Sequence, residues 1–227
     1  MTVTGLDAFC SAGGATRGYQ LAGFRMTGVD IRPQPRYVGE TFIQGDALEY
    51  IRAHGHEYDF IHASPPCQRY SRSTAALRAA GKHYPDLIGP TRQLLDQIGL
   101  PWVIENVPGA PLRQDIVLCG CMFPGELPGL KRERWFEVSW GPVFELRPPC
   151  HHPDPIVTVI GHGPNQHSPY RYVHGSVWTR LKQDAMGIDW MNREELGEAI
   201  PPAYARHVGE QLAAHLEQMR GREAVPS

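Results

Sequence analysis

Short apolar segments alternate with amphipathic ones along the first part of the chain. Apolar runs of four to seven residues, bounded by Gly, Pro, Asp or Asn, are typical of buried strands. Such strands are predicted at 3–9, 24–30, 41–44 and 58–63. Residues 15–21 and 47–54 have helical periodicity instead. Alternating strands and helices predict an α/β domain with a mainly parallel, Rossmann-like sheet.

The second part of the chain continues this pattern, with one interruption. Strands are predicted at 101–107, 115–118 and 135–138, and helices at 74–80, 91–98 and 204–220. The last helix repeats apolar residues every four positions, at Tyr204, Val208, Leu212 and Leu216. Between the strand at 135–138 and the helix at 204–220, residues 141–183 are rich in Pro, His, Tyr and Gly and have no regular hydrophobic period. We therefore expect a core over 1–140, an insert over 141–183, and a segment over 184–227 that completes the core.

A proline-rich turn follows the strand predicted at 58–63. It reads Ser64-Pro65-Pro66-Cys67-Gln68, and its two prolines end regular strand pairing because neither has an N–H to donate. Cys67 is thus presented at the carboxyl end of a strand, where ligands bind in open α/β sheets. A thiol in that place is a candidate nucleophile. A lone cysteine in such a turn can equally be a packing residue.

Other strand ends carry further candidate groups. The small-residue turn Cys10–Gly14 joins the first strand to its helix, as in nucleotide-binding βα units, and its glycines allow a ligand to approach the backbone. Asp30 ends the second strand, where a carboxylate can accept from ribose hydroxyls or remain a solvated acid. Asp46 can cap the helix that follows it. Glu105 is an acid at the end of a later strand, where it can form a structural ion pair with Arg134.

The amino-acid composition limits the class of protein but does not indicate a function. The chain has 227 residues, 41% hydrophobic and 20% charged, as expected for a globular domain. No apolar run has membrane-spanning length and no signal peptide is recognised, so we expect no membrane partner. Five cysteines suggest reduced thiols and a cytoplasmic location, in a bacterium or a phage-infected host.

The net charge of −2 does not by itself indicate a nucleic-acid partner, but its distribution is uneven. Residues 68–92 hold five basic residues against Asp86 alone. A mobile basic loop there would suit an anionic polymer, although loops often carry charge without such a role. The five bases are Arg69, Arg72, Arg78, Lys82 and Arg92.

Taken together, these motifs resemble the DNA (cytosine-5) methyltransferase family, in the form of a small phage- or prokaryote-like member. The motifs that carry the resemblance are Asp7-Ala8-Phe9 with Gly13-Gly14, Asp30, Gly45-Asp46, Pro66-Cys67-Gln68, Glu105-Asn106-Val107, Arg132-x-Arg134 and the closing Pro-Pro helix. The resemblance implies a Rossmann-like methyltransferase fold with a small target-recognition lobe. It also implies S-adenosylmethionine as cofactor, double-stranded DNA as partner, base flipping, a monomer, and a role of the restriction-modification kind.

The resemblance also assigns roles to individual residues. The catalytic residues would be Cys67, Glu105 and Arg134. The cofactor would contact Phe9, Ser11, Ala12, Gly13, Gly14, Asp30, Ile31, Asp46, Ala47, Pro66 and Ile200. The DNA would contact Gln68, Arg69, Ser71, Arg72, Lys82, Arg132 and Arg171, although Arg132 also fits a structural role as a solvated partner of Glu133 or Glu137.

The chain departs from the family pattern in its first turn and before its last helix. Ser11 stands where the family has a glycine, and Glu198-Ala199 replaces the usual Gly-Asn. Two alternative functions therefore stay open. One keeps the fold but acts on RNA or a free pyrimidine nucleotide, and the other is a non-catalytic DNA-binding relative.

Cysteines and histidines in the second half of the chain are candidate metal ligands. Cys119, Cys121, Cys150, His151 and His152 have the spacing C-x-C followed by C-H-H, which is not a standard zinc pattern. We therefore expect no metal and less than one zinc per chain. His162, His167 and His174 are expected at the surface or facing DNA.

The size of the insert bears on specificity. Its 43 residues can present few side chains to base edges, so the expected target is two to four base pairs and binding should weaken as salt rises. The candidates for reading bases are Asn165, Gln166, His167, Tyr170, Arg171, Tyr172 and His174.

Overall fold

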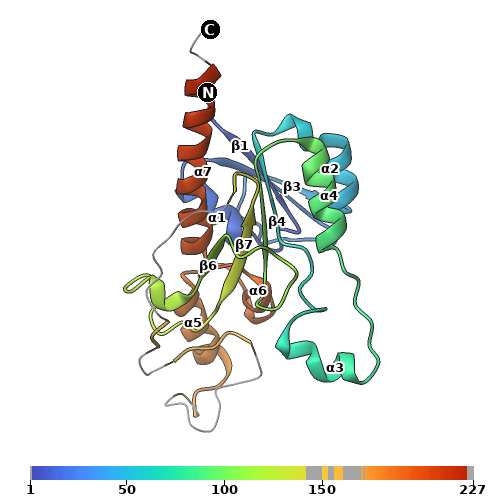
Figure 1. The fold of residues 1–227 in the computed structure, drawn as a ribbon. Helices are drawn as coiled ribbons and strands as arrows, with labels where there is room; N and C mark the ends of the chain where they lie inside the picture. The colour runs from blue at the N-terminus through green and yellow to red at the C-terminus, as the bar shows by residue number, and fades with distance from the viewer. Residues whose placement is uncertain (1, 142–149, 153–155, 161–169, 171, 224–227) are drawn as a thin grey trace.

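The structure is a computed structural model that describes residues 2–141, 150–152, 156–160, 170 and 172–223 (Figure 1). Within these residues, seven strands form one sheet in the order β3-β2-β1-β4-β5-β7-β6. The strands are β1 (Thr4–Ala8), β2 (Arg25–Asp30), β3 (Thr41–Gln44), β4 (Phe60–Ala63), β5 (Trp102–Asn106), β6 (Ile116–Leu118) and β7 (Arg134–Val138). The helices are α1 (Gly14–Leu21), α2 (Ala47–His54), α3 (Ala75–Ala79), α4 (Ile88–Ile98), α5 (Gly175–Met186), α6 (Arg193–Glu198) and α7 (Pro202–Glu223).

The first five strands of the sheet are parallel, and β7 is not. β1 pairs in parallel with β2 and β4, β2 with β3, and β4 with β5. β7 enters antiparallel between β5 and β6. The amino end of β7 therefore lies at the same edge of the sheet as the carboxyl ends of β4 and β5.

Helices cover both faces of the sheet and bury a separate apolar core on each. α1 and α7 lie on one face, and α2 and α4 on the other (Figure 1). Neighbouring residues of a strand alternate between the two cores, so that Phe60 packs in the α1–α7 core and Ile61 in the α2–α4 core. Central strands buried on both faces explain why their sequences read as continuous apolar runs.

Close contact between α1 and α7 depends on glycine. A Cβ on Gly18 would lie 2.4 Å from the backbone oxygen of Pro202, and one on Gly14 would lie 2.3 Å from that of Ile200. The sequence suggested that the glycine pair leaves room for a ligand. At Gly14 the room is filled instead by the backbone that precedes α7.

The predicted elements are confirmed with two corrections, and α6 is a further helix that the sequence did not predict. The helix expected at 91–98 begins earlier, at Ile88. The irregular texture expected up to residue 183 is wrong for its last part, because α5 runs from Gly175 to Met186 and crosses the boundary predicted at 183/184. Its buried positions Trp178, Lys182, Ala185 and Met186 follow helical spacing, which the Pro- and His-rich sequence before it obscured.

Among the described residues, no helix is both long enough and apolar enough to cross a lipid bilayer.

Candidate active site

A cavity of about 1090 Å³ opens at the carboxyl ends of the parallel strands. Ligands bind at this edge in doubly wound α/β folds. The predicted site residues that line it are Phe9, Ser11, Asp30, Ile31, Asp46, Ala47, Pro66, Cys67, Gln68, Ser71, Glu105, Arg134 and Ile200. We call the part formed after β1, β2 and β3 the β1–β3 wall, and the part formed by the ends of β4, β5 and β7 the β4–β7 wall.

The turn after β1 has an unusual backbone at the β1–β3 wall. Phe9 has φ of 61° and Ser11 has φ of 46°, in the left-handed region that L-residues with a side chain rarely adopt. Such strain, which costs about 1–3 kcal/mol per residue, is concentrated at ligand sites. The glycine that the family has in place of Ser11 would adopt this conformation without strain.

Asp30 is held at the end of β2 by backbone donors. Its Oδ2 accepts from the Ser11 N–H at 3.0 Å, and its Oδ1 accepts from the Arg32 N–H at 2.9 Å. The side chain is 7% exposed and faces the cavity, so each oxygen keeps a lone pair for a ligand donor.

Asp46 follows β3 and has a second, structural role. Its Oδ1 accepts from the Glu49 N–H at 3.0 Å and caps α2, as the sequence predicted. Ala12, Gly13 and Gly14 support the turn from behind the cavity rather than lining it. Gly13 has φ of 84°, a conformation that suits glycine.

Cys67, Glu105 and Arg134 meet at the β4–β7 wall. Cys67 follows β4, and Glu105 and Arg134 face each other across the pair β5–β7, with Arg134 Nε 2.9 Å from Glu105 Oε1. Both charged side chains are almost fully buried, at 7% and 8% exposure. Oε1 is buried against Arg134 and accepts no other hydrogen bond within the described residues.

Burial and charge oppose each other in this group. Burial raises the pKa of the Cys67 thiol, while the Arg134 guanidinium lowers it and Glu105 raises it again. Burial also raises the pKa of the Glu105 carboxyl, against the lowering effect of Arg134 and then of Arg132. Cys67 therefore needs positive charge beside it to become a thiolate at neutral pH.

Asn106, the middle residue of Glu105-Asn106-Val107, supports the loop that carries Cys67. Its side chain is 1% exposed, and its Nδ2 donates to the backbone oxygen of Pro65 at 2.8 Å. The carbonyl of Cys67 accepts from the N–H groups of Tyr70 and Ser71, both at 2.9 Å. The loop that carries the thiol is thus fixed at both ends.

Arg132 does not fit the DNA-contacting role, nor that of a solvated ion-pair partner. It is 4% exposed, and its Nη2 donates to the backbone oxygens of Gly197 and Ala199 at 2.9 and 2.6 Å. Glu137 pairs instead with Arg92 and Arg113. Arg132 is a structural residue that holds the turn between α6 and α7 because those carbonyls have no helical donor.

The basic loop after Cys67 is less available for anions than its sequence suggested. Arg78 Nη1 donates to the backbone oxygens of Gln68 and Ser71, at 2.8 and 2.7 Å, and Arg92 binds Glu137. Arg69 Nε lies 3.7 Å from Asp86 Oδ2, whereas the side chains of Arg72 and Lys82 are exposed. α3 and its flanking segments extend away from the sheet (Figure 1).

Gln68 and Ser71 differ from the other loop residues predicted to contact DNA. Both line the cavity, and Ser71 is 6% exposed, with its hydroxyl 2.8 Å from that of Ser73. They are placed to contact a group inside the cavity rather than the outside of a duplex.

Part of the predicted target-reading group cannot be placed. Asn165, Gln166, His167 and Arg171 lie outside the described residues, as does His162. Of the others, Tyr170 packs against Trp178, Tyr172 is exposed, and His174 occupies the position before α5.

Two further groups at the cavity were not foreseen. Asp7 is 1% exposed, its Oδ2 accepts from the Thr16 N–H and hydroxyl, and burial raises its pKa to about 7. Glu198 forms an ion pair with Arg32 across the mouth of the cavity. For Glu198, the sequence did carry a signal, because Glu198-Ala199 replaces the Gly-Asn of the family pattern.

No protein-family model and no curated protein matches this sequence. Solved structures do match its fold. The Schizosaccharomyces pombe Dnmt2 methyltransferase superposes with a TM-score of 0.57 at 13% identity, over 96% of this chain and 99% of that one. The Entamoeba histolytica methyltransferase EhMeth gives 0.57 at 12% identity, over 95% and 99%.

A weaker match is a candidate DNA modification methyltransferase encoded within an E. coli prophage. Its TM-score is 0.41 at 18% identity, and the aligned part spans 60% of this chain and 46% of that one. The two fuller matches show that this chain has the Rossmann-like fold of those methyltransferases, over nearly its whole length.

Proposed function

We propose that this protein transfers a methyl group from S-adenosylmethionine to carbon 5 of cytosine in DNA, through a covalent adduct with Cys67. The observation that carries the proposal is the convergence of Cys67, Glu105 and Arg134 on one cavity that also holds two strand-end carboxylates. The shared methyltransferase fold supports it.

The β1–β3 wall fits S-adenosylmethionine. Asp30 and Asp46 offer carboxylate oxygens where the ribose hydroxyls and the adenine amino group of a nucleoside need acceptors. The strained Phe9 and Ser11 lie beside them. When bound, this cofactor supplies an electrophilic methyl group.

Cys67 would begin the reaction by adding to carbon 6 of the cytosine ring. Carbon 5 of cytosine is a poor nucleophile, and the addition turns the ring into an enamine whose carbon 5 can attack the methyl group. Loss of the proton at carbon 5 then allows the thiolate to leave and the ring to regain its double bond.

Glu105 and Arg134 would stabilise the charge that this addition places on the ring. A Glu105 whose pKa is raised by burial can share a proton with ring nitrogen 3, and its carboxyl group can also accept from the exocyclic amine. Arg134 can donate to the oxygen at position 2 while it favours the Cys67 thiolate.

The base must leave the duplex to reach a cavity of this kind, which costs a few kcal/mol. Gln68 and Ser71 line the cavity directly after Cys67, and Arg72 and Lys82 are exposed on the loop that extends from it. This loop is the natural element to close over an extruded base.

Nucleoside mass analysis tests the proposal. DNA is incubated with the protein and methyl-deuterated S-adenosylmethionine, then digested; the expected product is deuterated 5-methylcytosine. Parallel reactions with RNA and with a free cytidine nucleotide separate the alternative substrates. Deuterium in another base, or in none of the three substrates, would contradict the proposal.

Covalent trapping tests the mechanism separately. In the presence of S-adenosylmethionine, DNA with 5-fluorocytosine should leave a stable complex with the protein, because after methyl transfer the fluorine on carbon 5 cannot depart as a proton does. The complex should be absent with Cys67→Ser and present with Cys10→Ser as the matched control. A complex that forms without Cys67 would exclude the proposed adduct.

A further inference from the structure

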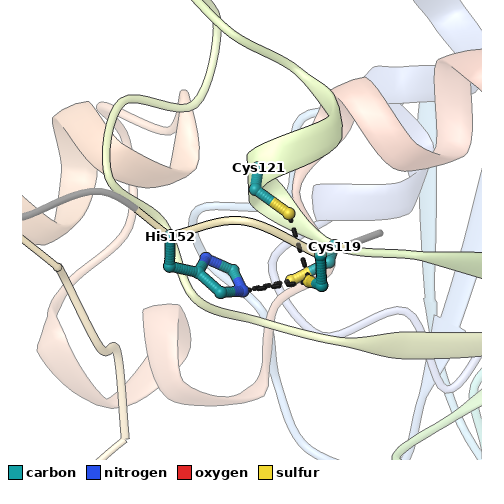
Figure 2. Close-up of side chains that lie close together, drawn as sticks. Cys119, Cys121 and His152 are labelled. Carbon is teal, nitrogen blue, oxygen red and sulfur yellow. Dashed lines mark hydrogen bonds between the residues drawn. The ribbon is translucent and has the colours of Figure 1, made fainter. Parts of the chain in front are cut away.

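We propose that Cys119, Cys121, Cys150 and His152 bind one structural zinc ion. Their ligand atoms, three sulfurs and the Nε2 of His152, all lie within 4.8 Å of one another. Figure 2 shows the side chains of Cys119, Cys121 and His152 turned toward a common point. The site is separate from the proposed reaction, because none of the four residues lines the large cavity.

The spacing of these atoms is close to that of a tetrahedral zinc site, with two of the distances about half an ångström shorter. Zn–S bonds of about 2.3 Å and Zn–N bonds of about 2.0 Å place tetrahedral ligand atoms roughly 3.5–3.8 Å apart. Here Cys119 Sγ lies 3.6 Å from His152 Nε2, Cys150 Sγ lies 3.0 Å from the same nitrogen, and Cys121 Sγ lies 3.2 Å from Cys150 Sγ. Small side-chain adjustments would centre an ion among them.

Zinc explains this arrangement better than a disulfide does. The sulfurs of Cys121 and Cys150 lie 3.2 Å apart, farther than the 2.03–2.05 Å of an S–S bond. A disulfide would also use only two of the four groups and leave a thiol and an imidazole beside it. Three thiolates and one imidazole are a standard ligand set for structural zinc.

The position in the fold indicates what the ion would do. Cys119 and Cys121 follow β6 directly, which pairs with β7 so that Leu118 lies opposite Arg134. Cys150 and His152 come from the insert, just before the parallel bridge between Val157 and Leu130. The ion would tie the base of the insert to the end of β6, which pairs with β7, the strand that carries Arg134. Four protein ligands leave no open position, so the site is structural and not catalytic.

This inference reverses the sequence-based expectation of no metal. The C-x-C and C-H-H motifs do not have standard zinc spacing, because the ligands come from two segments that only the fold brings together. The pattern also assigned no priority between His151 and His152. The structure does, since His152 faces the sulfurs and His151 is exposed.

Metal analysis of the full chain tests the site. The protein is purified without chelator and without a histidine tag, and zinc is measured by mass spectrometry against protein concentration. The expected result is one zinc per chain. Cobalt added to the metal-free protein should give thiolate-to-cobalt charge-transfer bands and the visible bands of a tetrahedral site.

Paired variants identify the ligands. Cys150→Ser and His152→Ala should lose most of the bound zinc, whereas His151→Ala and Cys10→Ser should retain it. Thiol-modifying reagents should release the ion in proportion to modification of these cysteines, as read with a colorimetric zinc indicator. Circular dichroism shows that each variant is folded.

Three outcomes would overturn the proposal. The first is folded protein that carries no zinc and gives no cobalt spectrum. The second is equal zinc loss in His151→Ala and His152→Ala. The third is a Cys121–Cys150 disulfide found by mass spectrometry in protein purified under reducing conditions. None of these outcomes depends on methyl transfer.

Discussion

The two walls of the cavity are built in different ways. In the β1–β3 wall, Asp30 and Asp46 come from neighbouring parallel strands, and each is anchored by backbone N–H groups within 19 residues along the chain. In the β4–β7 wall, Glu105 and Arg134 neutralise each other in a buried pair from strands that run in opposite directions. One wall offers free acceptors, and the other holds desolvated charges.

The two walls are therefore suited to different tasks. Anchored carboxylates with spare lone pairs favour binding, since a ligand hydroxyl or amine adds a bond without displacing one. Buried, opposed charges shift the pKa values of their neighbours, as they do for Cys67 and Glu105, and this is the condition for acid–base and nucleophilic chemistry. Changes in the first wall should therefore alter affinity, and changes in the second should alter rate.

The largest expected effect is that of Cys67→Ser. The alcohol cannot form the adduct at neutral pH, so turnover should fall by roughly 10³-fold or more. Cofactor affinity and thermal stability should hardly change, because Cys67 belongs to the β4–β7 wall only. Steady-state kinetics and calorimetry check both, with the exposed Glu49→Ala as control. A Cys67→Ser enzyme with wild-type turnover would remove the distinction between the walls.

Arg134→Gln should have the next largest effect. It removes a positive charge beside Cys67, so turnover should fall about 10²-fold. It should also raise the pKa of Cys67 further, because Arg134 now lowers it.

Iodoacetamide labelling of Cys67, followed by peptide mass spectrometry across pH, measures that pKa without any substrate. Labelling requires the thiolate, so its rate should rise with pH, and should still rise above pH 8.5, about where a free thiol is half ionised. Arg134→Gln should move the curve to higher pH, whereas Arg69→Gln should leave it in place. An unmoved curve in Arg134→Gln would refute the electrostatic role.

Asp30→Ala should weaken binding rather than catalysis. Loss of the carboxylate leaves the Ser11 and Arg32 N–H groups without an acceptor and removes the acceptor for the ligand. Cofactor affinity should therefore fall by about 1–3 kcal/mol, or about 5- to 150-fold. Titration calorimetry with S-adenosylmethionine checks this, with the exposed Glu49→Ala as control. Unchanged affinity would place the nucleoside elsewhere.

Asn106→Ala probes the support of the β4–β7 wall. It leaves the buried Pro65 carbonyl without its donor, and the free energy of unfolding should fall by about 1–3 kcal/mol. Urea denaturation measures this against Gln97→Ala, an exposed amide. Turnover should fall while cofactor affinity is kept. Equal loss of both would show that the two walls are not independent.

The smallest effect is expected for Lys82→Ala. Lys82 is exposed on the loop and 5.3 Å from the ring of Tyr84, so it can reach a phosphate but not the cavity. Binding should weaken only a few-fold and equally for all DNA sequences, and the slope of log affinity against log salt should decrease by about 0.9. Arg52→Ala on α2 is the matched control. A change in sequence preference would contradict a phosphate role.

Local sequence patterns determined most of the fold and one wall of the site. The βα units that carry Asp30 and Asp46 are consecutive in the chain. Their strand ends, glycine turns and helix caps depend on neighbouring residues, so the hydrophobic periods and the turn residues could be recognised in the sequence. Even the exception at Ser11 was visible as a departure. Its left-handed φ of 46° was not, because backbone strain leaves no trace in composition.

Only the tertiary structure decided the rest. Arg132 and Arg134 are two residues apart, yet one holds the α6–α7 turn and the other joins Glu105, because antiparallel insertion of β7 brings its amino end to the edge of the sheet where the cavity lies. The same holds for Cys119, Cys121, Cys150 and His152, which meet although up to 33 residues separate them along the chain. Contacts between distant segments depend on how the strands are ordered and directed, and a linear pattern does not record either.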